Sequence, residues 1–379
     1  MQERIWLSPP HMGGSEQKYI HEAFESNYIA PIGSNIDGFE KDIQNFLGER
    51  YVSVLNSGTA AIHLALIMLG IINGDYVLAS SFTFSATVNP IVYQGANPIL
   101  IDSESETWNM DPKLLEEAIL FAHSKNIYPK AVIVTHLYGM PAKLDEIIRI
   151  SENYGIPVIE DAAEALGSEY KGKKLGTFGD FGILSFNGNK IITTSGGGAL
   201  ICKNVEDARK TKFLASQARD EAPHYQHTKI GYNYRMSNVI AGIGRGQMEV
   251  LPERINQRRA NFRFYKELLG SVPGISFLEE PDKQFFSNYW LTTIVVDPEK
   301  TGGLTCQDIR LAFDADRIET RPLWKPMHLQ PVFSDATAFT NGTSEKLFEM
   351  GLCLPSGSNL SLEDKERIVM AFKKVGLYN

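Results

Sequence analysis

Residues 179–198 read Gly-Asp-Phe-Gly-Ile-Leu-Ser-Phe-Asn-Gly-Asn-Lys-Ile-Ile-Thr-Thr-Ser-Gly-Gly-Gly. The other candidate functional residues of the chain are interpreted by their relation to this stretch. The apolar run from Phe181 to Phe186 predicts a buried strand. The turn-forming Asn-Gly-Asn that follows ends this strand and leaves Lys190 on a loop beyond it. The glycines at 196–198 allow backbone to pass close to a bound group. The stretch therefore predicts a strand that carries a lysine to a site at its carboxyl end.

Lys190 is a residue type that enzymes use as a Schiff-base amine. A lysine beside apolar surface and small residues can be desolvated, and desolvation favours the neutral, nucleophilic amine. The alternative is a surface lysine that extends its charged end into water, and for a lone lysine this alternative is favoured. The choice depends on what other chemistry the chain brings to the same place.

Strand and helix patterns alternate through the first part of the chain. We expect strands at 51–55, 76–79, 98–102, 131–136, 157–161, 181–186 and 198–202. Helical patterns occupy 15–26, the residues from 60 onward, 85–93, 111–124, 144–154 and 205–216. This alternation predicts an α/β domain with a mainly parallel sheet and helices on both faces. Ligands bind to such sheets beyond the carboxyl ends of the strands, so residues there are candidates for function.

Three groups at strand ends complement Lys190. The turn Ser57-Gly58-Thr59 lies between a strand and a helix start, where free N–H groups and the helix dipole can bind a phosphate, although an ordinary helix cap is the alternative. Asp161 is followed by two alanines, so its carboxylate could hold a proton on the nitrogen of a flat ring. Phe84 could stack on that ring. Amine, carboxylate, phosphate turn and aromatic face are together the groups that pyridoxal phosphate requires.

The C-terminal part of the chain suits a second, smaller domain. Helices fit 237–249 and 252–270, and we place the domain boundary between them, which gives a large domain at 1–250 and a small α+β domain at 251–379. The small domain is expected to contain a strand at 289–296 and helices at 305–315 and 361–376, and the first helix of the chain can pack on it. The loop 321–328, Arg-Pro-Leu-Trp-Lys-Pro-Met-His, is stiffened by proline and rich in groups that bind ligands.

Composition and charge argue against several classes of function. The chain has 379 residues, 43% of them hydrophobic, which suffices for a large core and two domains. A net charge of −8 without a basic cluster argues against a nucleic-acid partner. No apolar run approaches a membrane span and no signal peptide is evident. The three cysteines are far apart, so we expect no metal site, no disulfide framework and a cytoplasmic location.

From about residue 7 to its C-terminus, the chain resembles the DegT/DnrJ/EryC1/StrS sugar aminotransferases, which are fold type I pyridoxal phosphate enzymes. The segments that carry the resemblance are 56–61 (Asn-Ser-Gly-Thr-Ala-Ala), 81–84 (Ser-Phe-Thr-Phe), 160–167 (Glu-Asp-Ala-Ala-Glu-Ala-Leu-Gly), 185–190 (Ser-Phe-Asn-Gly-Asn-Lys) and 231–235 (Gly-Tyr-Asn-Tyr-Arg). The resemblance implies a large domain with a mainly parallel, seven-stranded-type sheet and a smaller α+β C-terminal domain.

The resemblance also implies roles for individual residues. Lys190 is expected to bind the cofactor covalently, and Asp161 to pair with the pyridine nitrogen. Gly58, Thr59 and Ser185 match phosphate-binding positions.

Two further positions bear on assembly and proton placement. Asn233 matches a phosphate ligand that the neighbouring subunit donates, so the resemblance implies a homodimer with shared sites. Many relatives carry glutamine where this chain has Glu164, which would lie beside the phenolic oxygen of the cofactor. Because a carboxylate and a phenolate repel each other, one of the two is expected to hold a proton.

Among the members of the family, the chain looks most similar to those that aminate C4 of nucleotide-linked 4-keto-6-deoxy sugars. The expected reaction moves the amino group of L-glutamate to UDP-2-acetamido-4-keto-2,6-dideoxyglucose, for diamino sugars of the bacillosamine type. GDP-perosamine synthase or another 4-keto or 3-keto sugar aminotransferase is the alternative. Asn27, Ile29, Arg235, Trp324 and His328 are the candidate substrate ligands.

Two other functions remain open on the sequence. A related dehydratase would carry histidine at the position of Lys190, so the lysine argues against it. A regulatory or scaffold protein that binds the cofactor without turnover belongs to another class, and measuring the release of 2-oxoglutarate from glutamate would separate it from an enzyme.

Overall fold

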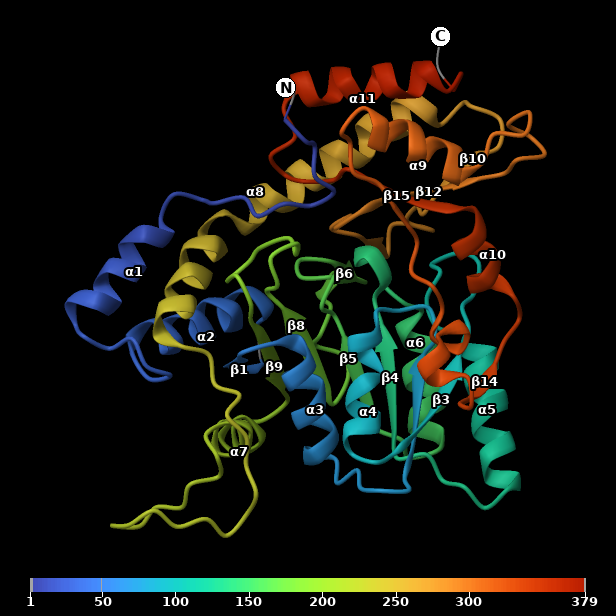
Figure 1. Ribbon diagram of the computed structural model, residues 1–379. Coiled ribbons are helices and arrows are strands. Elements are labelled where there is room, and N and C mark those ends of the chain that lie inside the picture. The colour runs from blue at the N-terminus through green and yellow to red at the C-terminus, as the bar shows by residue number, and fades with distance from the viewer. Residues whose placement is uncertain (1–2, 49, 378–379) are drawn as a thin grey trace.

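Figure 1 shows the chain as a computed structural model, which describes residues 3–48 and 50–377. The lower part in this view is a large sheet with helices on both sides, and the upper part is formed by C-terminal helices and a smaller sheet. Within the described residues the large sheet has the strand order β1-β9-β8-β5-β4-β2-β3-β14. The strands are β1 (Tyr51–Leu55), β2 (Tyr76–Ser80), β3 (Asn97–Ile101), β4 (Ala131–Thr135), β5 (Val158–Asp161), β8 (Phe181–Ser185), β9 (Gly198–Cys202) and β14 (Thr337–Phe339).

The sheet is mainly parallel, as predicted. The pairs from β14 through β3, β2, β4 and β5 to β8 are parallel, whereas β9 is antiparallel to both β8 and β1. The seven expected strands are confirmed, and β14 is an additional strand that no pattern indicated. Because β14 comes from residues 337–339, the C-terminal part of the chain completes the edge of the large sheet.

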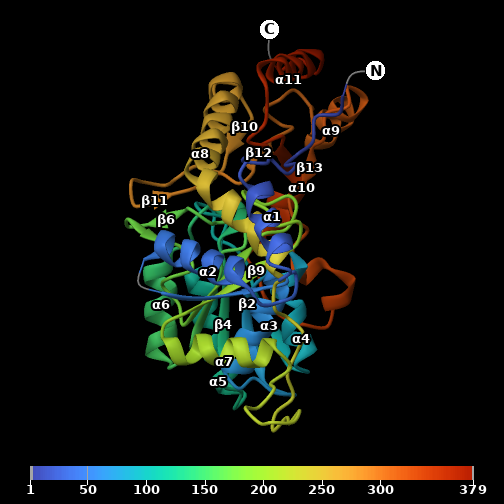
Figure 2. The same cartoon turned by 90° about the vertical axis from the view of Figure 1, so that its left-hand side faces the viewer.

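Both faces of the sheet are buried because apolar side chains point alternately to either side of each strand. Val54 and Leu78 belong to one core cluster, which contains residues of α2 (Ser34–Leu47), α5 (Pro112–Ser124) and α6 (Leu144–Asn153). Val77 and Ala79 belong to the other, with α3 (Gly58–Met68), α4 (Asn89–Tyr93) and α7 (Val205–Ala215). In the turned view of Figure 2, α2 and α7 lie in front of the sheet.

The expected helix 85–93 is divided into two short pieces. Residues Ser85–Thr87 form a 3-10 turn, η1, and α4 begins only at Asn89. Pro90 lies in the first turn of α4, where its missing N–H costs nothing. The division leaves the side chain of Thr87 at the edge of the sheet, where its hydroxyl donates a hydrogen bond to Asp161 at the end of β5.

The upper part contains a four-stranded antiparallel sheet in the order β10-β12-β15-β13. Its strands are β10 (Ile275–Phe277), β12 (Thr292–Val296), β13 (Arg321–Pro322) and β15 (Gly351–Leu354), and its helices are α9 (Cys306–Ala315), α10 (Thr343–Met350) and α11 (Leu362–Lys374). Capping boxes begin α9 at Thr305 and α11 at Ser361. The expected helices and the expected strand near 289–296 are therefore present.

Short elements connect the two parts. A three-stranded sheet consists of β6 (Glu169–Tyr170), β7 (Lys173–Lys174) and β11 (Phe285–Phe286). The remaining 3-10 turns are η2 (Leu137–Gly139), η3 (Met327–Leu329) and η4 (Pro331–Phe333).

The prediction of two helices around residue 250 was wrong. A single helix, α8 (Asn238–Leu269), runs through Pro252 from the lower to the upper part of the molecule (Figure 1). A proline inside a helix removes one hydrogen bond, but Leu251 and Ile255 on either side of it are buried in the core. This packing keeps the helix continuous. The division into domains at residue 250 falls inside α8 and stays a prediction.

The first helix, α1 (Glu16–Glu25), packs against the first half of α8. The hydroxyl of Tyr19 donates to Glu249, and the N-terminal end of α1 lies against Gly246. The N-terminal segment before α1 runs along the upper part, and Ile5 forms a bridge to Ile318.

Candidate active site

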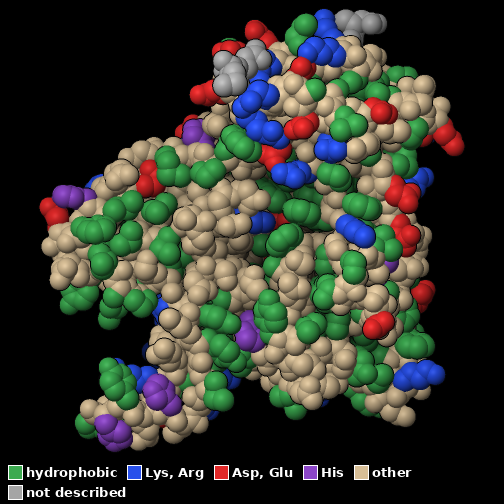
Figure 3. Space-filling model, viewed as in Figure 1, with side chains coloured by type: hydrophobic (Ala, Val, Ile, Leu, Met, Phe, Trp, Pro, Cys, Tyr) green, Lys and Arg blue, Asp and Glu red, His purple; other side chains and the backbone are tan. Residues whose placement is uncertain are grey.

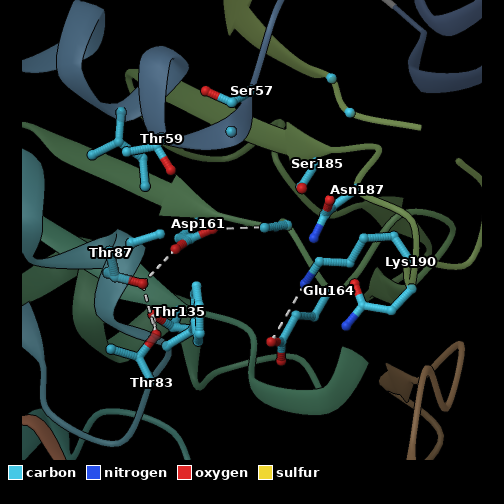
Figure 4. Close-up of a pocket in the computed structure, with 18 of the residues that line it drawn as sticks. Ser57, Thr59, Thr83, Thr87, Thr135, Asp161, Glu164, Ser185, Asn187 and Lys190 are labelled. Carbon is cyan, nitrogen blue, oxygen red and sulfur yellow. Dashed lines mark hydrogen bonds and ion pairs between the residues drawn. The ribbon is translucent and has the colours of Figure 1, made fainter. Parts of the chain in front are cut away.

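A cavity of about 390 Å³ opens at the carboxyl ends of the parallel strands. Figure 4 shows its side chains converging from different elements, and in Figure 3 the face seen in Figure 1 is hollowed between the lower and upper parts. Its lining residues are Asn56, Ser57, Gly58, Thr59, Ile62, Thr83, Phe84, Ala86, Thr87, Thr135, Asp161, Ala163, Glu164, Ser185, Asn187, Asn189, Lys190, Gly196, Gly197, Trp290 and Trp324. The structure thus brings eight of the predicted site residues (Ser57, Gly58, Thr59, Phe84, Asp161, Glu164, Ser185 and Lys190) to one place, together with Trp324.

The turn Ser57-Gly58-Thr59 begins α3 at one wall of the cavity. The hydroxyl of Ser57 caps the helix by accepting a hydrogen bond from the N–H of Ala60 at 3.0 Å. A Cβ atom at Gly58 would lie 3.2 Å from Cβ of Ser185, and one at Gly198 would lie 2.3 Å from the backbone of Ser57. Only glycine therefore allows β9 and the turn to approach, which leaves the helix N-terminus open to an anion.

Asp161 lies at the opposite side of the cavity, at the end of β5, and its carboxylate is held in one orientation. The hydroxyl of Thr87 donates to its Oδ2 at 2.6 Å, and the N–H of Ala163 donates to its Oδ1 at 3.2 Å. Behind Thr87, buried hydroxyls form a chain in which Thr83 contacts Thr87 at 2.7 Å and Thr135 donates to Thr83 at 3.1 Å. The chain fixes the direction in which the carboxylate faces (Figure 4).

Lys190 extends from the loop after β8 toward Glu164. Its Nζ lies 3.6 Å from Oε1 of Glu164, whose Oε2 accepts the N–H of Tyr138 at 2.7 Å. Burial raises the pKa of Glu164, and the attraction of Lys190 and the hydrogen bond from Tyr138 offset this only in part. The carboxyl group therefore holds a proton more readily than an exposed glutamate, which agrees in direction with the proton expected at this position.

Aromatic rings form the wall on the side of the C-terminal segments. Nζ of Lys190 lies 4.1 Å from the centroid of the Trp290 ring, and Phe84 and Trp324 have ring centroids 5.4 Å apart. Tyr138 stacks at an interplanar angle of 21° on both Trp290 and Trp324. Its hydroxyl accepts a hydrogen bond from the backbone N–H of Trp324 at 2.8 Å. Phe84 is 52% exposed, so its face is available to a ring in the cavity.

The residues fit pyridoxal phosphate. The open helix N-terminus, the oriented carboxylate and the amine stand on different walls of one cavity, as the phosphate, the ring nitrogen and the aldehyde carbon of that molecule require. The glycines at 58 and 198 leave room where side chains would close the phosphate end.

Four of the other predicted residues lie outside this cavity within the described chain. Asn27 and Ile29 are exposed in the loop between α1 and α2, and Asn233 is exposed in the segment before α8. The side chain of His328 lies between Ser81, 2.7 Å from its Nδ1, and Glu345, 3.1 Å from its Nε2. Both ring nitrogens of His328 thus have partners within the chain, and its role as a substrate ligand stays a prediction.

Arg235, the fifth of these residues, forms an ion pair outside the cavity. Its guanidinium donates to Oε1 of Glu40 and to the carbonyl of Val54, at 3.0 and 3.2 Å, and its side chain is only 11% exposed. Glu40 also pairs with Lys212. This arginine thus links α2 to β1 within its own chain, and its role as a substrate ligand stays a prediction.

His136, another strand-end residue, belongs to the core. Its Nδ1 accepts the N–H of Ala142, so its Nε2 donates to Glu160 at 3.1 Å. Burial raises the pKa of Glu160, but the bonds from His136 and from the N–H groups of Gly179 and Gly176 outweigh it and the pKa is lowered. This buried pair anchors the loop between β7 and β8.

Sequence reasoning missed several residues of the cavity, namely Thr83, Thr87, Thr135, Asn187 and Trp290. The threonines follow or end strands, so the strand-end rule applied to hydroxyl groups could have found them. Trp290 lies 100 residues from Lys190 in the chain, and no local pattern indicates their contact.

A second cavity of about 730 Å³ adjoins the first and shares Asn189, Trp290 and Trp324 with it. It extends between the N-terminal residues 6–10 and the loop 319–325. The aromatic wall thus faces both cavities.

Two kinds of feature are absent from residues 3–48 and 50–377. No helix there has the length and apolar character needed to cross a membrane. The same residues contain no group of three or more His, Cys, Asp or Glu side chains arranged to hold a metal ion.

The sequence pattern that describes the DegT/DnrJ/EryC1/StrS aminotransferase family matches residues 10–373. A protein of Bacillus subtilis (strain 168), EpsN, which bears the name of a pyridoxal phosphate-dependent aminotransferase, is 51% identical over 373 residues, or 97% of this chain and 95% of that protein. The GDP-perosamine synthase of Escherichia coli O157:H7 is 35% identical over 354 residues, which are 93% of each chain.

A comparison with solved structures also finds aminotransferases of this family. The crystal structure of a DegT DnrJ EryC1 StrS aminotransferase from Brucella abortus superposes with a TM-score of 0.88 over 95% of both chains, at 26% sequence identity. The similarity therefore covers the large sheet, the C-terminal part and the cavity between them.

Proposed function

The chain belongs to the DegT/DnrJ/EryC1/StrS aminotransferase family and is a pyridoxal phosphate-dependent sugar aminotransferase; from this premise we propose that it moves the amino group of L-glutamate to C4 of a nucleotide-linked 4-keto-6-deoxy sugar. The sugar we propose first is UDP-2-acetamido-4-keto-2,6-dideoxyglucose. The observation that carries the proposal is the convergence of Lys190, Asp161 and the turn 57–59 on one cavity next to a larger one.

The proposed binding of the cofactor uses three walls. The first N–H groups of α3, with the hydroxyls of Thr59 and Ser185, would hold the phosphate. Asp161 would hold a proton on the ring nitrogen, since Thr87 and Ala163 keep its carboxylate oriented. The bound pyridoxal phosphate would supply an electron sink for the carbanion that forms when a proton leaves the carbon bearing the amino group.

Lys190 would act as the base and acid of the reaction. Its Nζ would take the proton from Cα of glutamate in the first half-reaction and, in the sugar half-reaction, would deliver a proton to C4 of the sugar. Oε1 of Glu164 lies 3.6 Å from this Nζ and is the carboxyl oxygen that faces the amine. The aromatic wall of Trp290 and Trp324 would exclude water from this exchange.

Two observations support a nucleotide-linked sugar as the substrate, namely the name of a relative and the size of the second cavity. A relative with 35% identity is named GDP-perosamine synthase, a name that points to a nucleotide-linked sugar product. A substrate whose sugar reaches Lys190 can extend past Trp324 into the cavity of about 730 Å³. GDP-linked 4-keto-6-deoxymannose is therefore the second candidate, carried by that relative.

The test is amination of a substrate panel. UDP-, GDP- and dTDP-linked 4-keto-6-deoxy sugars are incubated with the enzyme and L-glutamate, and the amino sugar and 2-oxoglutarate are measured by mass spectrometry. We expect the UDP-linked N-acetyl sugar to have the highest kcat/KM. Higher kcat/KM with the GDP-linked sugar would favour a perosamine synthase, and deoxygenation at C3 without amination would indicate the dehydratase.

The proposal includes a homodimer in which Asn233 of one subunit reaches the phosphate end of the other site. Asn233 is exposed here, and its neighbours in the chain are anchored through Tyr234, whose N–H donates to Ala215 at 2.9 Å. Because the backbone next to Asn233 is anchored while its amide side chain is exposed, the side chain is suited to a contact across a subunit interface.

A further inference from the structure

The catalytic lysine lies on the face of a buried tryptophan. Trp290 is 1% exposed, and its ring centroid is 4.1 Å from Nζ of Lys190, within the distance at which a cation is attracted to an indole ring. The side chain of Lys190 is 13% exposed, so little water competes for the amine. Glu164 contacts the same Nζ at 3.6 Å.

Trp290 is held in this place by a network that reaches the backbone of the lysine loop. Its indole N–H donates to the carbonyl of Asn189 at 2.8 Å, and Ser8 donates to the same carbonyl at 2.5 Å. Arg258, which is fully buried in α8, donates to the carbonyl of Trp290 at 2.6 Å and to the hydroxyl of Ser8 at 2.9 Å. Burial lowers the pKa of Arg258 to about 9, so at neutral pH it still donates as a cation.

The network therefore brings together three segments that are far apart in the chain. The N-terminal segment supplies Ser8, α8 supplies Arg258, and the segment just before β12 supplies the ring of Trp290. All of them converge on the peptide that immediately precedes Lys190. These hydrogen bonds fix the position of the Trp290 ring relative to the amine of Lys190.

We propose that Trp290 is a positioning residue that holds the protonated amine of Lys190 on its indole face during proton transfer. In the proposed reaction the amine carries an extra proton between its two transfers, and the negative face of the ring stabilises that form while leaving the neutral amine almost unaffected. Loss of the ring face would reduce the ratio of protonated to neutral amine by about 2- to 30-fold. The inference rests on the proposed role of Lys190 but not on the identity of the sugar.

The test measures the reactivity of Lys190 directly. The full-length enzyme in its pyridoxamine phosphate form, in which the lysine is not bound to cofactor, is treated with acetic anhydride between about pH 6 and 10, because only a neutral amine is acetylated. Modification of Lys190 is quantified by peptide mass spectrometry. The pH at half-maximal modification reports the protonation of the amine, whereas access of the reagent changes only the plateau.

Fluorinated tryptophan at position 290 weakens the negative ring face and keeps the shape and the indole N–H. We expect it to lower the half-maximal pH by part of the roughly 0.4 to 1.5 units that complete loss of the ring face would cause. Trp290→Leu, if it folds as judged by circular dichroism, should lower it further. Fluorinated tryptophan at position 324 is the matched control and should cause no shift, because it lies in the same wall without contacting the amine.

The carboxyl groups that line this cavity in the described structure, Glu164 and Asp161, titrate too, so the comparison is repeated in the Glu164→Gln background. The shift should persist there. An unchanged half-maximal pH with fluorinated Trp290 in both backgrounds would overturn the proposal. A cofactor found on another lysine after borohydride reduction would instead overturn the proposed role of Lys190, independently of this result.

Discussion

At the scale of single residues, the chemistry of the cavity depends on where protons are held. Asp161 receives hydrogen bonds from Thr87 and Ala163, which fix the orientation of its carboxylate, whereas burial raises the pKa of Glu164 and favours its neutral form. The two carboxyl groups of the cavity thus have different surroundings.

Replacement of Lys190 by alanine should remove the visible absorbance band of bound cofactor and abolish transamination. The amine is the group in the cavity that can bond to the aldehyde carbon. Absorbance spectra and 2-oxoglutarate release measure both effects. Lys210→Ala, an exposed lysine on α7, is the control and should behave as wild type. A variant of Lys190 with normal band and turnover would refute the cofactor assignment.

Changes to Asp161 and to the hydroxyls behind it should lower kcat, and the effect should become smaller with distance from Asp161 along the chain of hydroxyls. Asp161→Asn should retain cofactor but lose most activity, because a neutral amide no longer stabilises a protonated ring nitrogen. Thr87→Val removes a 2.6 Å hydrogen bond to a charged group and should reduce kcat roughly 10- to 100-fold. Thr83→Val, one step further away, should have a smaller effect. Steady-state kinetics with glutamate measure the loss of kcat in each variant. A larger loss in Thr83→Val than in Thr87→Val would contradict this expectation.

Glu164 predicts a pH dependence of stability. Burial raises its pKa above the ordinary value of 4.5, so the folded chain holds the proton more tightly than the unfolded chain. The stabilisation is complete below about pH 4.5 and is lost as the pH rises through the raised pKa. Glu164→Gln should therefore lose less free energy of unfolding than wild type between pH 4.5 and 7.5.

Urea unfolding at both pH values measures this difference. The control is Glu366→Gln, an exposed carboxylate on α11, which should reproduce the pH dependence of wild type. An equal fall in wild type and in Glu164→Gln would mean that Glu164 is not protonated more readily in the fold.

At the scale of elements, helix α8 joins the two parts of the molecule through close packing at glycines. A Cβ at Gly246 would lie 2.7 Å from the backbone nitrogen of Glu16 in α1, and one at Gly244 would lie 2.5 Å from the ring of Phe39 in α2. Larger residues would force α1 and α2 away from α8. These glycines therefore determine how closely the N-terminal helices approach.

Gly246→Ala should destabilise the protein although alanine favours helices. Helix propensity contributes about 1 kcal/mol in favour of alanine, but backbone at 2.7 Å cannot move aside without shifting α1. We expect a net loss of about 1–3 kcal/mol, measured as a lower midpoint of urea unfolding. In Gly188→Ala, the nearest atom would be 3.9 Å away, so this variant should be nearly neutral. Unchanged stability of Gly246→Ala would show that α1 adjusts freely.

At the scale of the whole molecule, the proposed shared sites make the subunits complementary. Lys190→Ala and Asn233→Asp homodimers should both be nearly inactive, the second because a carboxylate repels the phosphate. If equal amounts are unfolded together and refolded, about half of the dimers are mixed, and one site of each mixed dimer carries neither change. About a quarter of all sites is then intact.

The activity of the refolded mixture should therefore recover to about a quarter of that of refolded wild type. The matched control is Lys190→Ala mixed with Asp161→Asn, whose changes lie in the same chain's cavity and leave every site with one lesion. Absence of recovery with Asn233→Asp would indicate that Asn233 serves its own subunit or none.

The chain's local patterns were sufficient for seven strands of the large sheet and for several of the residues at their ends. Strand 181–186, the turn 57–59 and the ends at Asp161 and Lys190 are encoded within short windows, because apolar runs, turn residues and helix caps act over a few residues. Since parallel strands end at one edge, these residues had to meet there.

Only the tertiary structure decided the contacts between distant segments. Trp290 on Lys190, Arg235 on Glu40 and β14 on β3 join residues that are 100 or more positions apart, and a local pattern cannot state which of many similar partners is chosen. The same holds for α8, whose helix passes through Pro252 because packing of its neighbours outweighs one lost hydrogen bond. The sequence by itself determined which chemistry lies at the sheet edge, whereas the packing of the C-terminal part against that edge determined what encloses the lysine.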